Sequence, residues 1–247
     1  MAGHEARLAA REAPADLAPT PDGDAPWISL FRAGAVAAAL AVVSYVAALI
    51  IVGVTSPPPT SGGAAMLEFV GAHRTVYIVR QLLWMTPSLF LMVVFLALAV
   101  ALRARSRSLA AVAGLIAVSS WVLTFAWPAT GDGSLAMVVL SDKYAEAGTL
   151  GQRAPFAAGA EVLIALNDVP AVIGVLQTLG ILLIALLMLR GPFGAGAAWL
   201  GIATGAVGML SEALRPLLGW AYAGYGLLLF VWLGWIAVAL WRHGRRG

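Results

Sequence analysis

Apolar runs about 20 residues long recur along most of the 247-residue chain, separated by polar turns. A run of this length forms a helix that spans the roughly 30 Å hydrocarbon core of a bilayer. Hydrophobic residues make up 61% of the chain and charged residues 11%, whereas a soluble domain of this size would need a far more polar surface. The sequence therefore predicts an all-α fold, a polytopic transmembrane helix bundle.

Six runs are predicted to cross the membrane. They cover approximately 33–54, 76–102, 109–129, 169–189, 195–210 and 217–241. The segment before them, 1–26, is polar with mixed charge and holds no apolar stretch, so we expect a disordered cytoplasmic tail and not a secretory signal. The six-span transmembrane domain is predicted to occupy 27–247.

Acidic and basic side chains divide between the two sides of this predicted bundle. After Arg32, one side carries all seven carboxylates: Glu68, Asp132, Asp142, Glu146, Glu161, Asp168 and Glu212. The charged side chains of the opposite side are all arginines: Arg103, Arg105, Arg107, Arg190, Arg242, Arg245 and Arg246. Basic residues near spans favour the cytoplasm, so both termini are predicted to be cytoplasmic and the protein to lie in the cytoplasmic membrane.

The predicted outer loops, 55–75 and 130–168, are long enough to hold short interfacial helices. We expect one such helix at 142–147, capped by Ser141 or Asp142, and a second at 153–166. Asn167-Asp168 followed by proline is a helix-start signal, which places a break at 167–168 before the fourth span.

The chain lacks residues that several membrane-protein chemistries require. The chain has no cysteine, its only lysine is Lys143 in an outer loop, and no histidine lies inside a predicted span. Thiol catalysis, a retinal Schiff base and a bis-histidine haem are therefore excluded, and we expect no cofactor and no metal site. A net charge of +3 is too small to suggest nucleic acid as a partner.

Polar residues gather at one predicted depth, near the outer ends of three spans. A charge facing lipid there costs about 1–3 kcal/mol, so these side chains should face each other or water. We predict an outward-facing polar pocket in which Arg80 opposes Asp168 or Glu212; the alternative is a structural cluster that ties helix ends together. The pocket residues are Arg80, Gln81, Glu161, Asn167, Asp168, Glu212 and Arg215.

Small and aromatic residues support helix packing. Gly201, Gly205 and Gly208 give the fifth span a face that allows close approach, used within the chain or, alternatively, as a homodimer seam. Trp232 and Trp235 lie deep in the sixth span, where core packing is expected. Aromatic residues at the span ends, among them Tyr77 and Trp199, are typical of interfacial belts.

Two stretches carry a family resemblance. The first contains Leu140-Ser-Asp-Lys-Tyr-Ala-Glu-Ala with Ala158-Gly-Ala-Glu161, and the second contains Leu183-Ile-Ala-Leu-Leu-Met-Leu-Arg190 with Ala198-Trp199-Leu200-Gly201. Over roughly 140–210 the chain resembles the bacterial multi-span family of domain of unknown function 4386. The resemblance implies an inner-membrane protein with about six spans, and it supplies no catalytic residues.

The function expected from these observations is binding or transport of a small or lipid-like ligand through the polar pocket. The alternative is a non-catalytic accessory or assembly protein of the membrane. A membrane enzyme is a third, weaker alternative, because carboxylates are available in type but no spacing selects an acid–base pair.

Overall fold

The computed structural model describes residues 23–126, 129–130, 133–168, 172–218 and 223–246. Most of the predicted tail, 1–22, lies outside these described residues. The last part of that segment is structured, because Ala25–Trp27 forms a short 3₁₀ helix, η1, immediately before the first long helix.

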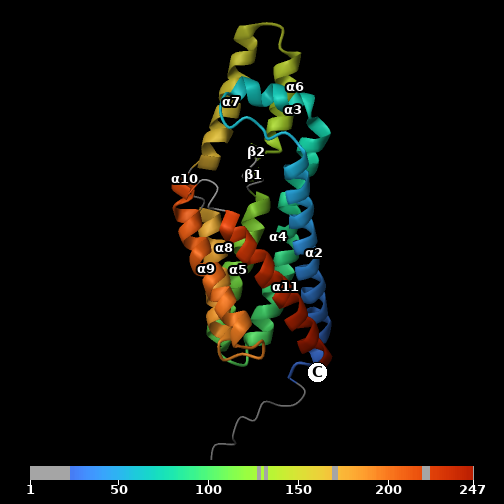
Figure 1. The fold of residues 1–247 in the computed structure, drawn as a ribbon, viewed down its shortest axis with the longest axis vertical. Helices are drawn as coiled ribbons and strands as arrows, with labels where there is room; N and C mark the ends of the chain where they lie inside the picture. The colour runs from blue at the N-terminus through green and yellow to red at the C-terminus, as the bar shows by residue number, and fades with distance from the viewer. Residues whose placement is uncertain (1–22, 127–128, 131–132, 169–171, 219–222, 247) are drawn as a thin grey trace, which may run out of the picture.

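The long helices run along the long axis of the molecule (Figure 1). Among the described residues, contacts join six of them into a closed ring, in which each helix packs mainly against two neighbours. In ring order they are α2 (Ile28–Val54), α4 (Arg74–Leu102), α5 (Arg107–Ala126), α8 (Val172–Met188), α9 (Ala195–Ala213) and α11 (Ala223–Arg246), which returns to α2. Four of them, α2, α4, α5 and α11, are long and apolar enough to cross a membrane, and α8 is a shorter apolar helix. The fold is thus all-α, with the helices of a membrane protein.

A second, smaller layer of helices covers one end of the ring. The helices α3 (Gly63–Ala72), α6 (Ala136–Glu146) and α7 (Leu150–Asp168) pack against one another there, and we call this layer the cap. Its core contains Met66, Leu67, Val70, Met137 and Tyr144. Figure 1 shows the cap at the top and the C-terminus at the opposite end, so we name the two ends the cap end and the termini end.

Three small elements complete the chain. The strands β1 (Ala129–Thr130) and β2 (Gly133–Ser134) form an antiparallel hairpin between α5 and α6, and α10 (Arg215–Leu218) lies between α9 and α11. The third predicted span, 109–129, therefore ends too late, because α5 ends at Ala126 and Ala129 belongs to the hairpin. The sixth, 217–241, starts too early, because α10 holds the residues up to Leu218 and α11 begins at Ala223.

The cap helices also differ from the prediction. Helix α6 begins at Ala136 rather than at Asp142, and the Ala136 N–H donates to the Ser134 hydroxyl oxygen at 3.2 Å. The two side chains expected to cap it make tertiary contacts instead: the Ser141 hydroxyl donates to Leu67 O at 2.7 Å, and Asp142 forms an ion pair with Arg74. Helix α7 is longer than the predicted 153–166. The predicted break at 167–168 falls where α7 ends, at the edge of the described residues.

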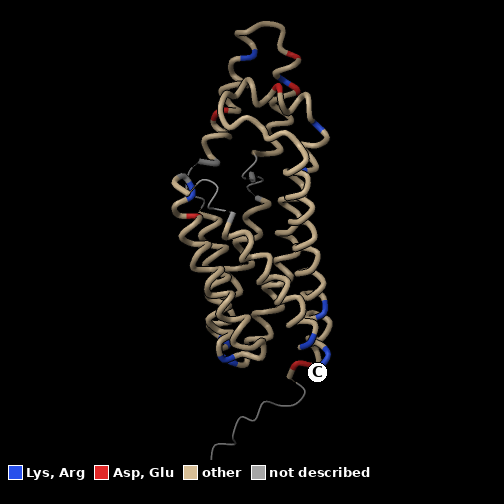
Figure 2. The backbone as a smooth tube through the Cα atoms, viewed as in Figure 1, with Lys and Arg blue, Asp and Glu red and all other residues tan. Residues whose placement is uncertain are grey.

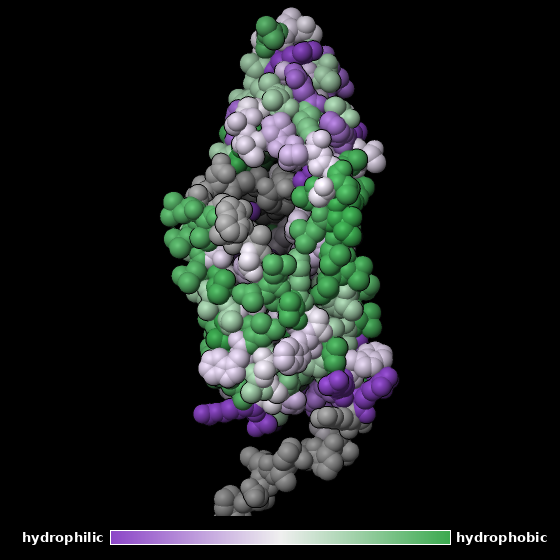
Figure 3. Space-filling view, in the orientation of Figure 1, coloured by the Kyte–Doolittle hydropathy of each residue, from purple (hydrophilic) through white to green (hydrophobic). Residues whose placement is uncertain are grey.

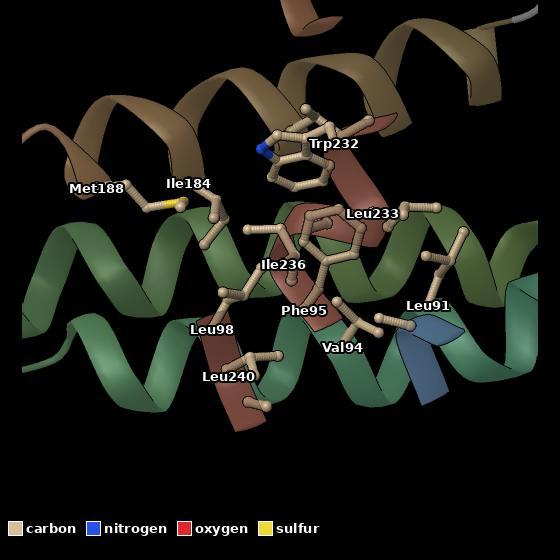
Figure 4. Packing of buried hydrophobic residues seen from close by; sticks show 14 of the residues in the cluster. Leu91, Val94, Phe95, Leu98, Ile184, Met188, Trp232, Leu233, Ile236 and Leu240 are labelled. Carbon is tan, nitrogen blue, oxygen red and sulfur yellow. The ribbon is translucent and has the colours of Figure 1, made fainter. Parts of the chain in front are cut away.

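Large apolar side chains fill the interior of the ring over its middle and its termini-end half. Trp232 is fully buried, lies 6.0 Å from Phe95 between ring centroids, and donates from Nε1 to Ala197 O at 3.1 Å. Figure 4 shows this packing with Leu98, Ile184 and Met188 pointing into the same space. Trp232 is a core residue as predicted, whereas Trp235 is 48% exposed and its ring lies against Gly196 of α9.

The outside of the ring is apolar. Leucine and valine side chains are exposed along its helices, such as Val43 (63%), Leu115 (68%) and Val231 (60%). On the face shown in Figure 3, hydrophobic residues cover much of the middle of the molecule, and hydrophilic residues lie at the cap end and the termini end. A soluble protein rarely exposes so large an apolar area, whereas lipid tails solvate it at no cost.

Aromatic residues at the two ends follow the belt prediction only in part. At the termini end Trp199 and Trp241 are exposed, as a belt requires. At the cap end Tyr77 is 2% exposed, and its hydroxyl donates to Ser134 O at 3.1 Å, so it fastens α4 to the hairpin instead of facing the interface.

The glycines of α9 pack against other helices of the same chain. A Cβ at Gly201 would lie 2.5 Å from the Trp232 Nε1, and one at Gly205 would lie 2.7 Å from the backbone nitrogen of Leu182. Gly208 is covered in the same way by Thr178 and Tyr225. All three positions are buried against α8 and α11, so the homodimer seam suggested for them would require these helices to separate first.

Candidate functional site

Polar side chains are buried in the cap-end half of the ring. The most buried charged groups are Arg80 on α4 (3% exposed) and Glu212 on α9 (5% exposed). The other buried polar side chains at this end are Gln81, Ser88, Ser120, Ser134, Thr178 and Ser211. Figure 2 shows that charged residues otherwise concentrate at the ends of the molecule, so the buried arginine marks a candidate functional site.

Arg80 connects two neighbouring helices of the ring. Its guanidinium Nη1 donates to Ser56 O at 3.2 Å and approaches the Thr55 hydroxyl oxygen at 3.4 Å. Both acceptors lie just after α2, where Ser56-Pro-Pro-Pro prevents the helix from continuing. A cation at the C-terminal end of a helix interacts favourably with the helix dipole, so this arginine stabilises the junction of α2 and α4.

A cavity of about 140 Å³ lies against Arg80. Its walls come from the end of α2, the end of α3 and the first two turns of α4. They consist of Thr55, Ser56, Phe69, His73, Val76, Tyr77 and Arg80. A water molecule takes about 30 Å³ in the liquid, so the cavity holds several waters or the head of a small molecule, and its open side leaves room for a short tail. It is smaller than the roughly 300–1,000 Å³ pockets that enclose a whole drug-sized ligand.

The residues around the cavity include a cation, hydrogen-bonding groups and apolar side chains, and the surface they expose to it is almost entirely apolar. Arg80 supplies a planar donor fork that matches carboxylate and phosphate oxygens. The exposed His73 ring contacts Phe69 O through Nδ1 at 3.1 Å, and its other ring nitrogen is not used in that contact. Phe69 and Val76 add apolar area. This composition fits an anionic group carried on a short apolar chain.

Glu212 lies on another part of the ring. A Cβ at Gly174 would come within 2.4 Å of the Glu212 carboxyl carbon, so the carboxylate rests on the glycine at the start of α8. Helix α9 is not a neighbour of α4 in the ring. Arg80 contacts the end of α2 and Glu212 contacts the start of α8. The predicted opposition of the two side chains stays a prediction.

Glu161 belongs to the cap and not to a pocket with Arg80. Its carboxylate Oε1 accepts a hydrogen bond from Gly63 N at 2.6 Å, which caps the N-terminus of α3 from the side of α7. The prediction grouped Glu161 with the spans because it precedes one in sequence. The long outer loops instead fold into helices of their own, and these carry it into the cap.

The remaining predicted pocket residues lie in different parts of the structure. Gln81 is fully buried on α4, next in sequence to Arg80. Arg215 is the first residue of α10 and is half-buried. The side chains of Asn167 and Asp168, in the last turn of α7, lie outside the described residues, as does the predicted pair of Arg80 with Asp168.

Six wall residues were not among the predicted pocket residues: Thr55, Ser56, Phe69, His73, Val76 and Tyr77. Part of this set has a sequence signal, because positions 73, 77 and 80 have the i, i+4, i+7 spacing that aligns side chains on one helix face. The contribution of Thr55 and Ser56 has no such signal, because it depends on α2 ending beside α4.

Comparison of the chain with models of known protein families, with curated proteins and with solved structures gives no significant match. The resemblance of residues 140–210 to the family of domain of unknown function 4386 therefore stays a prediction.

Proposed function

We propose that this chain is a six-span protein of the cytoplasmic membrane that binds a small amphiphilic anion in the Arg80 cavity, beneath an outward-facing cap. The single observation that carries this proposal is a nearly fully buried arginine on the wall of a cavity. An arginine buried in an apolar bundle is costly, and such residues are typically retained for ligands or pathways.

The proposal of six spans is supported by the ring, because all six long helices pack side by side in it. Helices α8 and α9 stand beside the four candidate spans, and the 17 residues of α8 extend about 26 Å, close to the thickness of a hydrocarbon core. The orientation rests on the arginines of the termini end, which include Arg103, Arg105 and Arg190 and favour the cytoplasm.

The ligand class follows from the cavity wall. A carboxylate or phosphate monoester can accept hydrogen bonds from the guanidinium of Arg80, while a chain of a few methylenes lies along Phe69 and Val76. The interior towards the termini end is filled by side chains such as Trp232 and Phe95. The geometry therefore supports binding at the cap end better than an open path through the ring.

The test is ligand-induced thermal stabilisation of the purified protein in detergent, with hexanoate and butyl phosphate as probes and uncharged hexanamide as the matched control. We expect both anions to raise the unfolding temperature, with saturation, and hexanamide to leave it unchanged. At 100 times the dissociation constant, binding adds about 2.7 kcal/mol to the free energy of unfolding.

Two variants make this test specific to the cavity. Val76 lines the cavity and Val79 does not, yet both lie on α4 and both are 38% exposed. Val76→Phe is expected to fill the cavity and abolish the anion-induced shift, and Val79→Phe to retain it. Arg80→Lys should keep a reduced shift, because the charge remains but the donor fork is lost. Equal shifts in both valine variants, or an equal response to hexanamide, would contradict the proposal.

A further inference from the structure

A second feature lies at the termini end, outside the cavity of Arg80. A groove of about 480 Å³ runs between the start of α5 and the end of α8. It is lined by two arginines, a serine and four leucines: Arg105, Arg190, Ser106, Leu109, Leu186, Leu187 and Leu189. The arginines come from different turns, Arg105 from the α4–α5 turn and Arg190 from the α8–α9 turn, and the packing of α5 on α8 brings them to one groove.

These two arginines have no ionic partner among the described residues. Other arginines at this end do have partners: Arg103 contacts Asp24 at 2.9 Å, and the Arg245 guanidinium lies 5.3 Å from the centre of the Trp241 ring. Arg105 and Arg190 are both exposed. Two like charges converging on one groove repel each other, so an anion between them is favourable.

The leucines of the groove face outward beside this positive charge. Leu109 is 59% exposed, Leu186 is 46% exposed and Leu189 is 37% exposed. They lie at the end of the apolar zone of the ring, where the hydrocarbon of a bilayer meets its head groups. An apolar groove that leads to a pair of arginines is complementary to a molecule with a phosphate at one end and acyl chains at the other.

We infer that this groove binds an anionic phospholipid. The phosphodiester lies between Arg105 and Arg190 and accepts hydrogen bonds from both guanidinium groups. The upper parts of the acyl chains lie along Leu109, Leu186 and Leu189. The general preference for arginine on the cytoplasmic side places charge at this end, but it does not require two arginines to share a leucine-lined groove. The lipid would fasten the α4–α5 hairpin to the α8–α9 hairpin.

The experiment measures lipid binding to the purified full-length chain by native mass spectrometry and by thermal shift, with phosphatidylglycerol and phosphatidylcholine of identical acyl chains. We expect phosphatidylglycerol to bind at least tenfold more tightly than phosphatidylcholine. Arg105→Gln combined with Arg190→Gln should remove that preference. Arg107→Gln combined with Arg242→Gln removes the same charge from exposed arginines outside the groove and should change the preference less than twofold.

A third arm separates a lipid site from a phosphate site. Glycerol 3-phosphate carries the phosphate without acyl chains and should not compete with the lipid at tenfold excess, and Leu186→Gln should weaken the lipid severalfold. Competition by glycerol 3-phosphate, equal binding of the two lipids, or an equal loss in the Arg107 and Arg242 variant would each overturn the inference. The cavity of Arg80 is at the other end of the ring, so failure of this test leaves the amphiphile proposal untouched.

Discussion

Gly205→Ala is expected to lower the free energy of unfolding of the ring by about 3 kcal/mol, at the upper end of what overpacking costs. The added Cβ would lie 2.7 Å from the backbone nitrogen of Leu182 and 2.8 Å from its Cα. A backbone cannot rotate away as a side chain can, so α8 and α9 must separate. Reversible unfolding in mixed detergent, followed by circular dichroism, measures the change.

Gly234→Ala is the matched control for this effect. Gly234 lies in α11, and a Cβ there would meet nothing within 4 Å. Alanine is a better helix former than glycine by about 1 kcal/mol, so this variant is expected to be neutral or slightly more stable. If the two variants were equally stable, the close packing of α8 on α9 would be wrong.

Gly63→Ala is expected to open the cap while leaving the ring folded. Its Cβ would lie 2.0 Å from Ala157 O and 3.1 Å from Glu161 N, both backbone atoms of α7. Helix α3 must therefore move away, and the 2.6 Å hydrogen bond from Gly63 N to the Glu161 carboxylate is lost. We expect amide hydrogen exchange in α3 and α7 to accelerate on the order of 100-fold, which corresponds to about 3 kcal/mol of local stability.

The control for the cap is Gly151→Ala. Gly151 is also on α7, but a Cβ there meets nothing within 4 Å, so exchange in α3 should not change. Exchange in the ring helices is expected to stay as slow in Gly63→Ala as in the parent chain. Acceleration throughout the ring would show that the cap and the ring unfold together, contrary to their separate hydrophobic cores.

The positions of the long helices could be predicted because the length and hydrophobicity of each helix can be read from its own stretch of sequence. The ends of α2, α4, α8 and α9 lie within a few residues of the predicted bounds. Contacts between helices could not be predicted in this way. The interfacial aromatic expected at Tyr77 is buried under the hairpin, and the cap expected at Ser141 bonds instead to Leu67 O. In both cases a residue distant in sequence, which no local pattern reveals, provides the partner.

The candidate site was predictable to a similar extent. The cost of a charge near a span end drew attention to Arg80 and Glu212, which the structure shows to be buried. It could not decide which groups face them, because depth along a helix says nothing about direction around it. Glu161 illustrates the limit: it precedes a predicted span, but the fold of the long loop turns it towards Gly63 in the cap.

The most direct test of the whole account is the side of the membrane on which the cap lies, and the cysteine-free chain allows it to be measured with single introduced thiols. Cysteine is introduced at one of three exposed positions: Ala145 in the cap, Ser108 at the start of α5 or Ala195 at the start of α9. With a membrane-impermeant maleimide on intact cells, we predict that Ala145→Cys is labelled at once. Ser108→Cys and Ala195→Cys should be labelled only after the membrane is permeabilised. Labelling of Ala195→Cys in intact cells would show that α8 does not cross the membrane as proposed. The reverse pattern at all three positions would place the Arg80 cavity on the cytoplasmic side and contradict the outward-facing site.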